Sequence, residues 1–345
     1  MLSLISNSFD PKPRQQRLAC CQRFGIAVGM TTRCLVCLIL LASLTGCQKF
    51  NVNTIKDRLT PSNNRDWQPE LATVPSAIID GPQYTLRNIR NSNYLTDQDY
   101  VVDYYDRQIS IDQIQSVDFI VVPFNSAPRL AHTMMSFGLD DGSYIALSVE
   151  VRKEIGEKFN AVLGMGKKFE LIYVLSDERD VIRLRTKHRD SDVYVYPTIA
   201  SPAQARLLFT NVIKRVNKLA VEPEFYNSIT NNCTTNLAGH VNDLSPDKIT
   251  YGWKVLLPGL SAEYAYELGL LDNRIPFEDL TSIALVNLLA EEHFDDPQFS
   301  QRIRSRHGRI ERYLERQQNR EATLRGSGEQ ILEPEAHPRR PLLRR

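Results

Sequence analysis

The segment HTMMSFGLDDGSYIALSVEV, residues 132–151, decides how this chain folds. Two largely apolar runs, 132–139 and 143–151, flank Asp140-Asp141-Gly142, whose residues favour a tight turn. We therefore expect a hairpin of two antiparallel strands. Side chains alternate between the faces of a strand. On the second strand, one face should carry Tyr144, Ala146, Ser148 and Glu150, and the core face Ile145, Leu147, Val149 and Val151.

Further short apolar runs on both sides of this hairpin predict more strands. They are IQSVDFIVVPF (114–124), FELIYVLS (169–176), VIRLRT (181–186) and YVYP (194–197). The run DERD separates the second and third of these and predicts another hairpin. Neighbouring strands joined by brief polar turns indicate a mainly antiparallel sheet.

Helix signals follow the strands, and together the two indicate an α+β fold. Ser201-Pro202 is an N-cap followed by an N1 proline, and it precedes the apolar positions Leu208, Val212, Val216 and Leu219 at helical spacing. A second helix is expected from about Asn232 to Asn242, a third capped by Ser261, and a fourth over 278–292. Residues 297–320 are only weakly amphipathic.

The N-terminus has the features of an exported lipoprotein. The apolar run 34–44 is followed by Thr45-Gly46-Cys47. It has the length of a secretory leader and is shorter than the ~20 residues that cross a bilayer. The ending LTGC resembles the bacterial lipobox, which predicts a signal peptide over 1–46 and lipid on Cys47. An ordinary cleaved leader and a core helix are the alternatives, and Met30 is an alternative start to Met1.

This leader sets the expected domain organisation. Residues 47–75 are the lipidated cysteine and a polar tether whose Trp67 could dock on the domain. A single domain follows over 76–307, and 308–345 form a basic tail expected to be disordered, with contact to lipid headgroups as the alternative. Gln48 in place of aspartate after Cys47 indicates the outer membrane. The formal net charge of +1 gives no reason to expect a nucleic-acid partner.

Cys233 is the one thiol left unmodified if processing occurs at Cys47. It lies in NNCTTN, residues 231–236, where a helix is expected to begin. A helix N-terminus favours thiolate over thiol, so Cys233 is a candidate nucleophile, with Asn232 and Thr234 as candidate oxyanion or auxiliary groups. Buried free cysteines are also common in protein cores, so packing alone is the alternative.

A thiolate nucleophile usually works with a base, and His132 is the best candidate. It opens the first strand of the hairpin in an apolar setting, although an isolated histidine at a strand start is more often a hydrogen-bonded structural residue. Glu150 either orients the His132 ring, as in Cys-His-acid systems, or lies on the solvent side of its strand. His240 is two helical turns from Cys233, ~10 Å away. Of the remaining histidines, His188 and His293 lie among charged residues. His307 and His337 lie in the basic C-terminal part, where they are expected to be solvated.

Several blocks together resemble the N-terminal periplasmic domain of the Lnb-type lipoprotein intramolecular acyltransferases, over about residues 65–307. They include AHTMMSF (131–137), LSVEVRKEIGEKF (147–159), FELIYVLSDERDVIRLRT (169–186) and EFYNSITNNCTTNL (224–237). The resemblance implies a permuted papain-like (NlpC/P60-like) fold in which the order is His132, Glu150, Cys233. It also implies Cys233 as the nucleophile that forms a thioester, His132 as the base and Glu150 as its partner. Arg152, Tyr173 and Arg179 fall in matching blocks, and Arg179 is interpreted as structural.

The predicted function is that of a lipid-anchored, periplasm-facing acyltransferase or hydrolase that depends on a cysteine. Its expected partners are the membrane and an acyl-bearing lipid, lipoprotein or related ester or amide. The alternatives are a peptidoglycan amidase or peptidase of the NlpC/P60 kind, and a non-catalytic envelope binding or assembly lipoprotein. No cofactor or metal is expected, because the histidines and acids show no HExxH-type spacing. Beyond residue 75 no apolar run is long enough to span a membrane, unlike Lnb-type enzymes. An apolar tunnel at Cys233 would favour acyl chains, and an open polar groove would favour peptides.

Overall fold

The computed structural model covers the whole chain and describes residues 59–246 and 248–326. All of these belong to one compact unit, Lys56–Arg345. The predicted signal peptide, Cys47, the first half of the tether and residues 327–345 of the predicted tail lie outside the described residues. No helix in the described part of the chain is long and apolar enough to cross a membrane.

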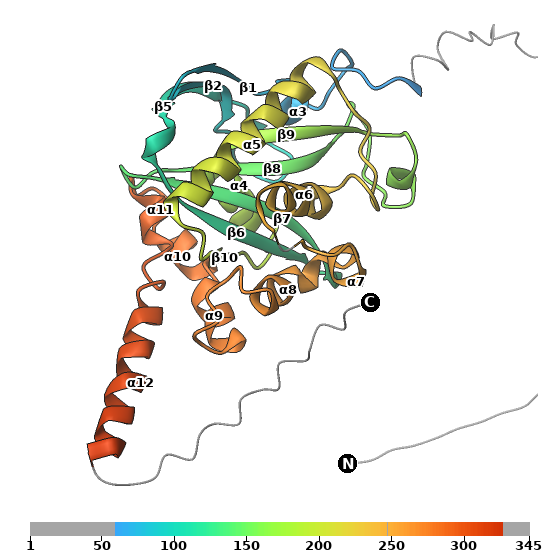
Figure 1. Cartoon of the computed structure of the whole chain (residues 1–345). Helices are drawn as coiled ribbons and strands as arrows, with labels where there is room; N and C mark the ends of the chain where they lie inside the picture. Colours follow the sequence, from blue (N-terminus) through green and yellow to red (C-terminus); the bar gives the residue numbers. More distant parts are fainter. Residues whose placement is uncertain (1–58, 247, 327–345) are drawn as a thin grey trace, which may run out of the picture. The chain divides into compact units, whose positions relative to one another are not determined.

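An eight-stranded sheet forms the centre of this unit (Figure 1). Seven strands follow the order β1-β2-β9-β8-β7-β6-β10, and β5 pairs with β2. All pairings are antiparallel except one parallel contact between β2 and β9, which confirms the mainly antiparallel sheet. A separate pair consists of β3 (Asn93–Tyr94) and β4 (Tyr100–Val101). The strands of the main sheet are β1 (Ser76–Asp80), β2 (Gln83–Arg90), β5 (Tyr104–Ser110), β6 (Ile114–Phe124), β7 (Ala127–Leu139), β8 (Tyr144–Arg152), β9 (Glu170–Asp177) and β10 (Tyr194–Pro197).

The predicted central hairpin is present as β7 and β8. Its pairing runs from Gly138↔Tyr144 to Met134↔Ser148, and Gly142 takes the positive φ of 78° that the turn needs. Both strands continue past the last pair, β7 back to Ala127 and β8 on to Arg152. His132 and Glu150 therefore each lie two residues beyond the last pair between β7 and β8.

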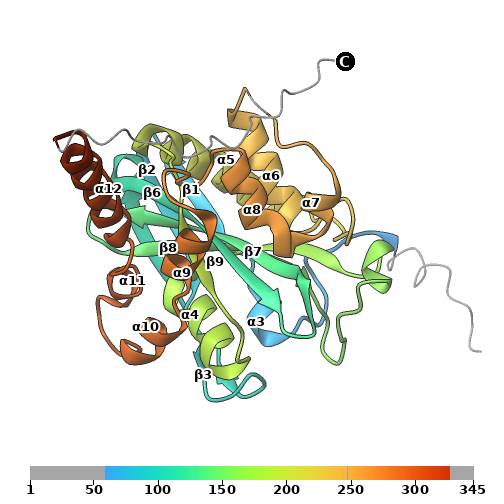
Figure 2. The ribbon, with the colours of Figure 1, turned by 90° about the horizontal axis from the view of Figure 1, so that it is seen from below.

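Helices cover both faces of the sheet (Figure 2). On one face, α5 (Pro202–Val221) and α6 (Cys233–Leu244) pack on Phe137 and Leu147. The other face, with Met134 and Ala146, is covered by α4 (Glu178–Arg183), α10 (Asn287–Glu292) and α11 (Phe299–Arg302). Ala146 and Ser148 are fully buried, so the alternative interpretation, in which this face of β8 is a solvent side, is wrong.

The second predicted hairpin, around DERD, is also wrong. After β9 the chain enters α4 and continues as a π-helical turn, η3 (Leu184–His188). The Asp177 side chain accepts a hydrogen bond from the Arg179 backbone N–H and so starts a helix. Val181 and Ile182 then pack into the second core. A short apolar run does not distinguish a strand from a buried helix by periodicity alone.

The first two predicted helices are present as α5 and α6, and the later ones differ. The capping box of Ser201 and Gln204 starts α5 as expected. Ser261 is the first residue of α8 (Ser261–Glu267) but donates its hydroxyl to the Pro258 carbonyl instead of capping. The expected helix over 278–292 is broken into α9 (Phe277–Ala284) and α10, because the backbone at 285–286 pairs with β10 and its flank. The remaining short elements are α3 (Pro69–Ala72), η1 (Ile111–Gln113), η2 (Leu163–Met165), α7 (Trp253–Leu256) and η4 (Pro258–Leu260).

The folded unit extends beyond the predicted boundaries of 76 and 307. Trp67 is buried beneath the Arg152 guanidinium, which lies 4.3 Å from the ring centroid. Asn63 donates to the carbonyls of Leu219 and Ala220 at the end of α5. At the other end, α12 (Arg309–Gly326) occupies much of the expected disordered tail, and its Ile310 is buried. The second half of the tether is thus part of the domain.

Candidate active site

The N-terminus of α6 holds the thiol. The Asn232 side chain accepts from the Thr235 backbone N–H at 2.9 Å, and the Thr235 hydroxyl accepts from the Asn232 backbone N–H, which completes a capping box. Cys233 is the first helical residue and is 8% exposed. Leu237 and Val241 hold the helix against the sheet. The local sequence therefore fixes Cys233 in the first turn, where free backbone N–H groups face outward.

Polar groups of β7 act on the sulfur. His132 and the backbone and hydroxyl of Thr133 each lower the pKa of the Cys233 thiol. The Thr133 and Thr234 hydroxyls are 3.1 Å apart, and Thr234 Oγ1 is 3.8 Å from Sγ. Burial by itself raises the pKa of the Cys233 thiol. The hydrogen bond and positive charge of His132 outweigh burial and lower this pKa to about 7.

A serine joins His132 to Glu150. His132 Nε2 is 2.7 Å from Ser148 Oγ, and Ser148 Oγ is 2.6 Å from Glu150 Oε1. Glu150 Oε1 is also 3.5 Å from Nε2. The single hydroxyl proton of Ser148 is donated to the carboxylate, so Ser148 accepts from Nε2–H, and this assigns Nδ1 to the side of Cys233.

The charges of this chain of residues shift each other's pKa values. Burial lowers the pKa of His132, but the Glu150 carboxylate and the Cys233 hydrogen bond raise it to about 9. Burial raises the pKa of Glu150, and His132, Arg185 and Ser148 together hold it well below its usual range. Between pH about 7 and about 9 the site therefore favours a thiolate–imidazolium pair.

Ser148 and Arg185 were missed by the sequence analysis. Arg185 Nη2 lies 3.2 Å from Glu150 Oε1, and it comes from the π-helical turn that follows α4. Ser148 could have been found, because it precedes Glu150 by two residues on the same face of one strand. No local signal points to Arg185, because the sequence predicts a strand over 181–186 instead of the helical turn that carries this residue.

Asn232 and Thr234 lie at the site in different ways. The Asn232 amide is occupied by helix capping and by its 2.8 Å bond to the Ser228 carbonyl. Apart from the Thr235 N–H, which Asn232 caps, this leaves the backbone N–H groups of the first turn of α6 as candidate oxyanion donors. The Thr234 hydroxyl lies between Thr133 and Sγ.

His240, His307, Tyr173 and Arg179 make hydrogen bonds that hold the fold together. His240 is buried against the Tyr173 hydroxyl at 2.9 Å, and burial lowers its pKa to about 4. His307 is not solvated as expected: its Nε2 lies 3.1 Å from the Val195 carbonyl oxygen. Arg179 donates to the Asp296 carbonyl oxygen at 2.6 Å. None of these contacts involves Cys233.

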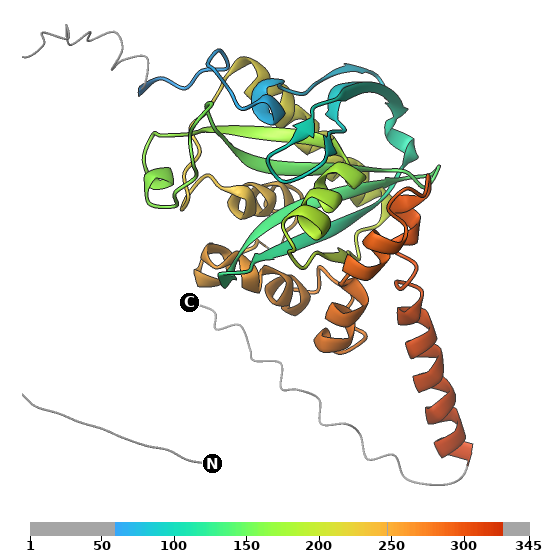
Figure 3. The same ribbon diagram turned by 180° about the vertical axis from the view of Figure 1, so that it is seen from behind.

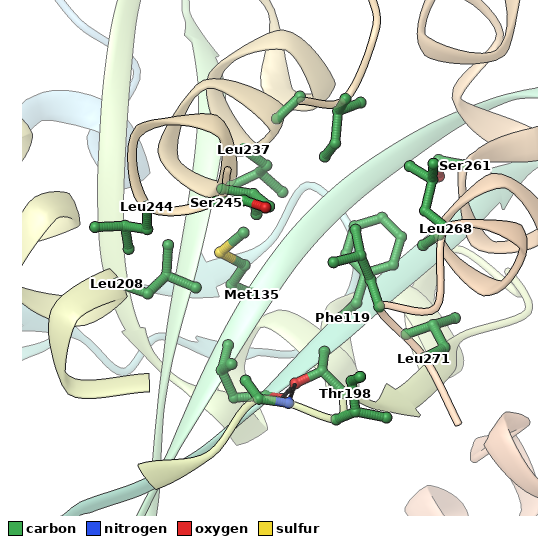
Figure 4. A pocket seen from close by; sticks show the side chains of 18 of the residues that line it. Phe119, Met135, Thr198, Leu208, Leu237, Leu244, Ser245, Ser261, Leu268 and Leu271 are labelled. Carbon is green, nitrogen blue, oxygen red and sulfur yellow. Dashed lines mark hydrogen bonds between the residues drawn. The ribbon is translucent and has the colours of Figure 1, made fainter. Parts of the chain in front are cut away.

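An apolar cavity of about 270 Å³ (Figure 4) is lined by Thr234, the residue that follows Cys233. It lies between α5, α6, α8 and the strands β6 and β7. Along α6 it is lined by Thr234, Leu237, Val241 and Leu244, which share one face of the helix. Phe119, Met135, Leu208, Leu268 and Leu271 complete much of the wall. The cavity is thus an apolar compartment whose thiol end is marked by Thr234.

A comparison with protein families identifies the domain that carries this site. The family model of the Lnb N-terminal periplasmic domain matches residues 100–259. These residues belong to the Lnb N-terminal periplasmic domain family. The match contains His132, Ser148, Glu150 and Cys233 and is narrower than the resemblance over 65–307. The name of the Lnb domain locates it in the periplasm.

Searches of curated proteins and of solved structures found no relative of this chain. The mixed α+β architecture is plain from the sheet and its helices, whereas the permuted papain-like arrangement stays a prediction. Within the described residues, no three histidine, cysteine, aspartate or glutamate side chains are grouped as metal ligands would be.

Proposed function

We propose that this protein is a lipid-anchored periplasmic thiol enzyme that transfers or hydrolyses acyl groups through a thioester on Cys233. The observation that carries the proposal is that His132 lowers the pKa of the Cys233 thiol, next to an apolar cavity lined by the adjacent Thr234. The match to the Lnb N-terminal periplasmic domain supports the periplasm as the compartment of this enzyme. Cys47 is the proposed lipid attachment site and the outer membrane the proposed location.

The first half of the reaction forms the thioester. The Cys233 thiolate attacks the carbonyl carbon of an ester or amide, and the carbonyl electrons move to its oxygen. In this proposal, first-turn backbone N–H groups of α6 donate to that oxyanion. When the tetrahedral intermediate collapses, the bond to the leaving oxygen or nitrogen breaks, and the His132 imidazolium gives it a proton.

The second half releases the acyl group. Neutral His132 takes a proton from an incoming amine or water, which attacks the thioester carbonyl and expels the Cys233 thiolate. Ser148 and Glu150 hold Nε2–H throughout, so Nδ1 stays directed at the reacting atoms. Glu150, itself held by Arg185, stabilises the imidazolium of each protonated stage.

The lining of the cavity favours an acyl chain as the bound group. Engineered apolar cavities of about 150 Å³ already hold benzene, and the cavity beside Cys233 measures about 270 Å³. Its wall is mainly leucine, valine and aromatic side chains along α6 and the sheet. A peptide substrate would need polar partners for its backbone groups, so the cavity favours acyl transfer over cleavage of peptidoglycan peptides.

The experiment is a search for the acyl-enzyme. The full chain is incubated with phospholipid vesicles, and the peptide that contains Cys233 is examined by mass spectrometry. We expect an added acyl mass on that peptide in the wild type, none in Cys233→Ser, and slower accumulation in His132→Ala. A folded wild-type protein that gains no adduct from ester or amide lipids, and whose Cys233 reacts no faster than that of His132→Ala, would contradict the proposal.

A further inference from the structure

The surface beside the active site carries an unusual concentration of exposed apolar side chains. They lie in the loop between β8 and β9, just before α6, and in the segment around α7. Most soluble monomers expose few contiguous apolar patches of this kind, and those that occur mark interaction sites. We name this set the apolar rim: Ile155, Phe159, Val162, Leu163, Met165, Ile229, Tyr251 and Trp253.

Contacts along the backbone join the parts of the apolar rim into one surface. Asn227 and Ser228 donate to the carbonyls of Met165 and Ala161 in the β8–β9 loop. The Tyr251 hydroxyl donates to the carbonyl of Ile229. Residues 227–229 thus connect the loop to the α7 segment, and Cys233 follows only four residues after Ile229. The rim therefore borders the end of α6 that holds the thiol.

Positive charge accompanies the apolar side chains. The β8–β9 loop contains Lys153, Lys158, Lys167 and Lys168 against two acids. Glu154 pairs with Arg65, and Glu157 with Lys168. Within the described part of the chain no ion pair engages Lys158 or Lys167, and both are exposed. Exposed apolar and aromatic groups interleaved with lysines suit the headgroup region of an anionic bilayer.

The described chain also begins on this side of the molecule. The Ser62 backbone N–H donates to Glu170, the first residue of β9 and directly after the loop. Residues 48–58, which separate Cys47 from the described chain, can span at most roughly 40 Å. A lipid on Cys47 would hold this side near the membrane. This one step rests on the lipid anchor proposed above; the apolar and charge arguments do not.

We propose that the apolar rim inserts into the surface of an anionic phospholipid membrane, so that the thiol end of the cavity faces the lipid. The membrane is favoured over a protein partner because the rim combines exposed aliphatic side chains, a tyrosine and a tryptophan with Lys158 and Lys167, which no ion pair engages in the described part of the chain. An acyl chain could then move from the bilayer toward α6 with little passage through water.

The two tryptophans allow a direct test. Trp253 is 61% exposed on the rim, whereas Trp67 is buried. The lipidated full chain is placed in phosphatidylethanolamine–phosphatidylglycerol vesicles whose acyl chains are brominated, and tryptophan fluorescence is compared with that in unbrominated vesicles. We expect strong quenching in the wild type and little in Trp253→Phe, which retains only Trp67.

Matched variants separate the rim from apolar exposure elsewhere. Val162 and Leu288 are both 68% exposed, but Leu288 lies in α10, on the side of the molecule away from the β8–β9 loop (Figure 3). Val162→Asp should reduce the quenching of Trp253 at least twofold, and Leu288→Asp should leave it unchanged. Lys158→Gln with Lys167→Gln should reduce it in anionic vesicles more than in purely zwitterionic ones.

Two results would overturn the proposal. One is Trp253 fluorescence that brominated lipid does not quench although the protein remains on the vesicles. The other is a lipid-free dimer that Val162→Asp dissociates, which would assign the rim to a second copy of the chain. Neither result bears on the acyl-enzyme, which is measured separately as mass added to Cys233.

Discussion

At the residue scale, the site consists of a thiol, an imidazole, a hydroxyl and a carboxylate linked in series. Each group has a partner whose charge or proton suits it, so Cys233 has a lowered pKa although it is buried. The chain of contacts ends at Arg185, which adds a positive charge 3.2 Å from the partly buried carboxylate of Glu150. Two predictions belong to this scale.

The first prediction concerns the reactivity of the thiol with pH. The pKa of Cys233 is lowered to about 7, so the thiolate is present above this pH and lost as the pH falls through it. In His132→Ala the imidazolium is gone and burial remains, so the midpoint should rise above about 8.5, the ordinary thiol value. Iodoacetamide modification of the Cys233 peptide, followed from pH 5 to 10, measures both midpoints. Equal midpoints in the two proteins would contradict the assigned pair.

The second prediction concerns Ser148 as a positioning residue. Ser148→Ala removes a hydrogen bond to a charged group, worth about 2 kcal/mol, so acylation should slow about 30-fold. The pKa of His132, raised to about 9 in the wild type, should fall because the link to Glu150 is weakened. The alkaline limb of the acylation rate should then move to lower pH. A purely structural serine would change stability and leave that limb in place.

At the element scale, α6 performs two tasks with different faces. Its first turn presents Cys233, and the face with Leu237, Val241 and Leu244 forms one wall of the cavity. The cap at Asn232 fixes where the helix begins and so where the sulfur lies. The cap and the cavity wall can be tested separately.

Removing the cap should loosen the first turn. Asn232→Ala is expected to lower the free energy of unfolding by about 1 kcal/mol and to raise the pH midpoint of Cys233 modification, because the helix end frays. Asn232→Ser keeps a capping oxygen and serves as the control. Urea unfolding and the pH profile together check this, and an Ala variant as stable as the Ser variant would be evidence against the cap.

Filling the cavity should select against long acyl chains. Ala238 lines the cavity on α6, and Ala238→Phe is expected to reduce acylation by long-chain p-nitrophenyl esters about tenfold or more, since each excluded methylene loses ~0.8 kcal/mol of burial. Acetyl ester should react at an unchanged rate. Gly239→Ala, exposed on the same helix, is the control. Equal losses for short and long esters would mean that the chain binds elsewhere.

At the scale of the whole molecule, a buried charge cluster fastens the C-terminal segment to the sheet. Arg304 donates to Asp118 on β6 at 2.6 Å and to Glu178 on α4 at 2.7 Å, and Ser136 on β7 donates to Glu178. All four side chains are buried. The same α4 leads into the turn that carries Arg185, so this cluster supports the far side of the site.

Breaking the cluster should destabilise the whole unit. Arg304→Ala leaves two buried carboxylates without their cation, which costs about 3–5 kcal/mol. Arg302→Ala removes an ion pair whose arginine is half exposed and should cost less than about 1 kcal/mol. Chemical unfolding of both variants gives the comparison. Similar small losses would show that the cluster is not a structural requirement.

The antiparallel hairpin and the capped helices were predictable because their signals are local. The Asp140–Gly142 turn, the Ser201-Pro202 start and the Asn232 cap each act within a few residues. The helix after Asp177 and the break at 285–286 were not predictable in this way. The helix after Asp177 forms because its apolar side chains pack into the core beside Met134. The break at 285–286 forms because the backbone there bonds to the flank of β10.

The sequence by itself determined the sheet-forming hairpin, the helix that begins at Cys233 and the candidate pair of Cys233 and His132. Periodicity, turn residues and caps are properties of short segments, and counting shows that Cys233 is the one cysteine after residue 47. Only the tertiary structure decided that Ser148 links His132 to Glu150, that Arg185 closes the series and that an apolar cavity begins beside the thiol. These features depend on strands that separate and on helices packed from far along the chain, and no local pattern records such distances.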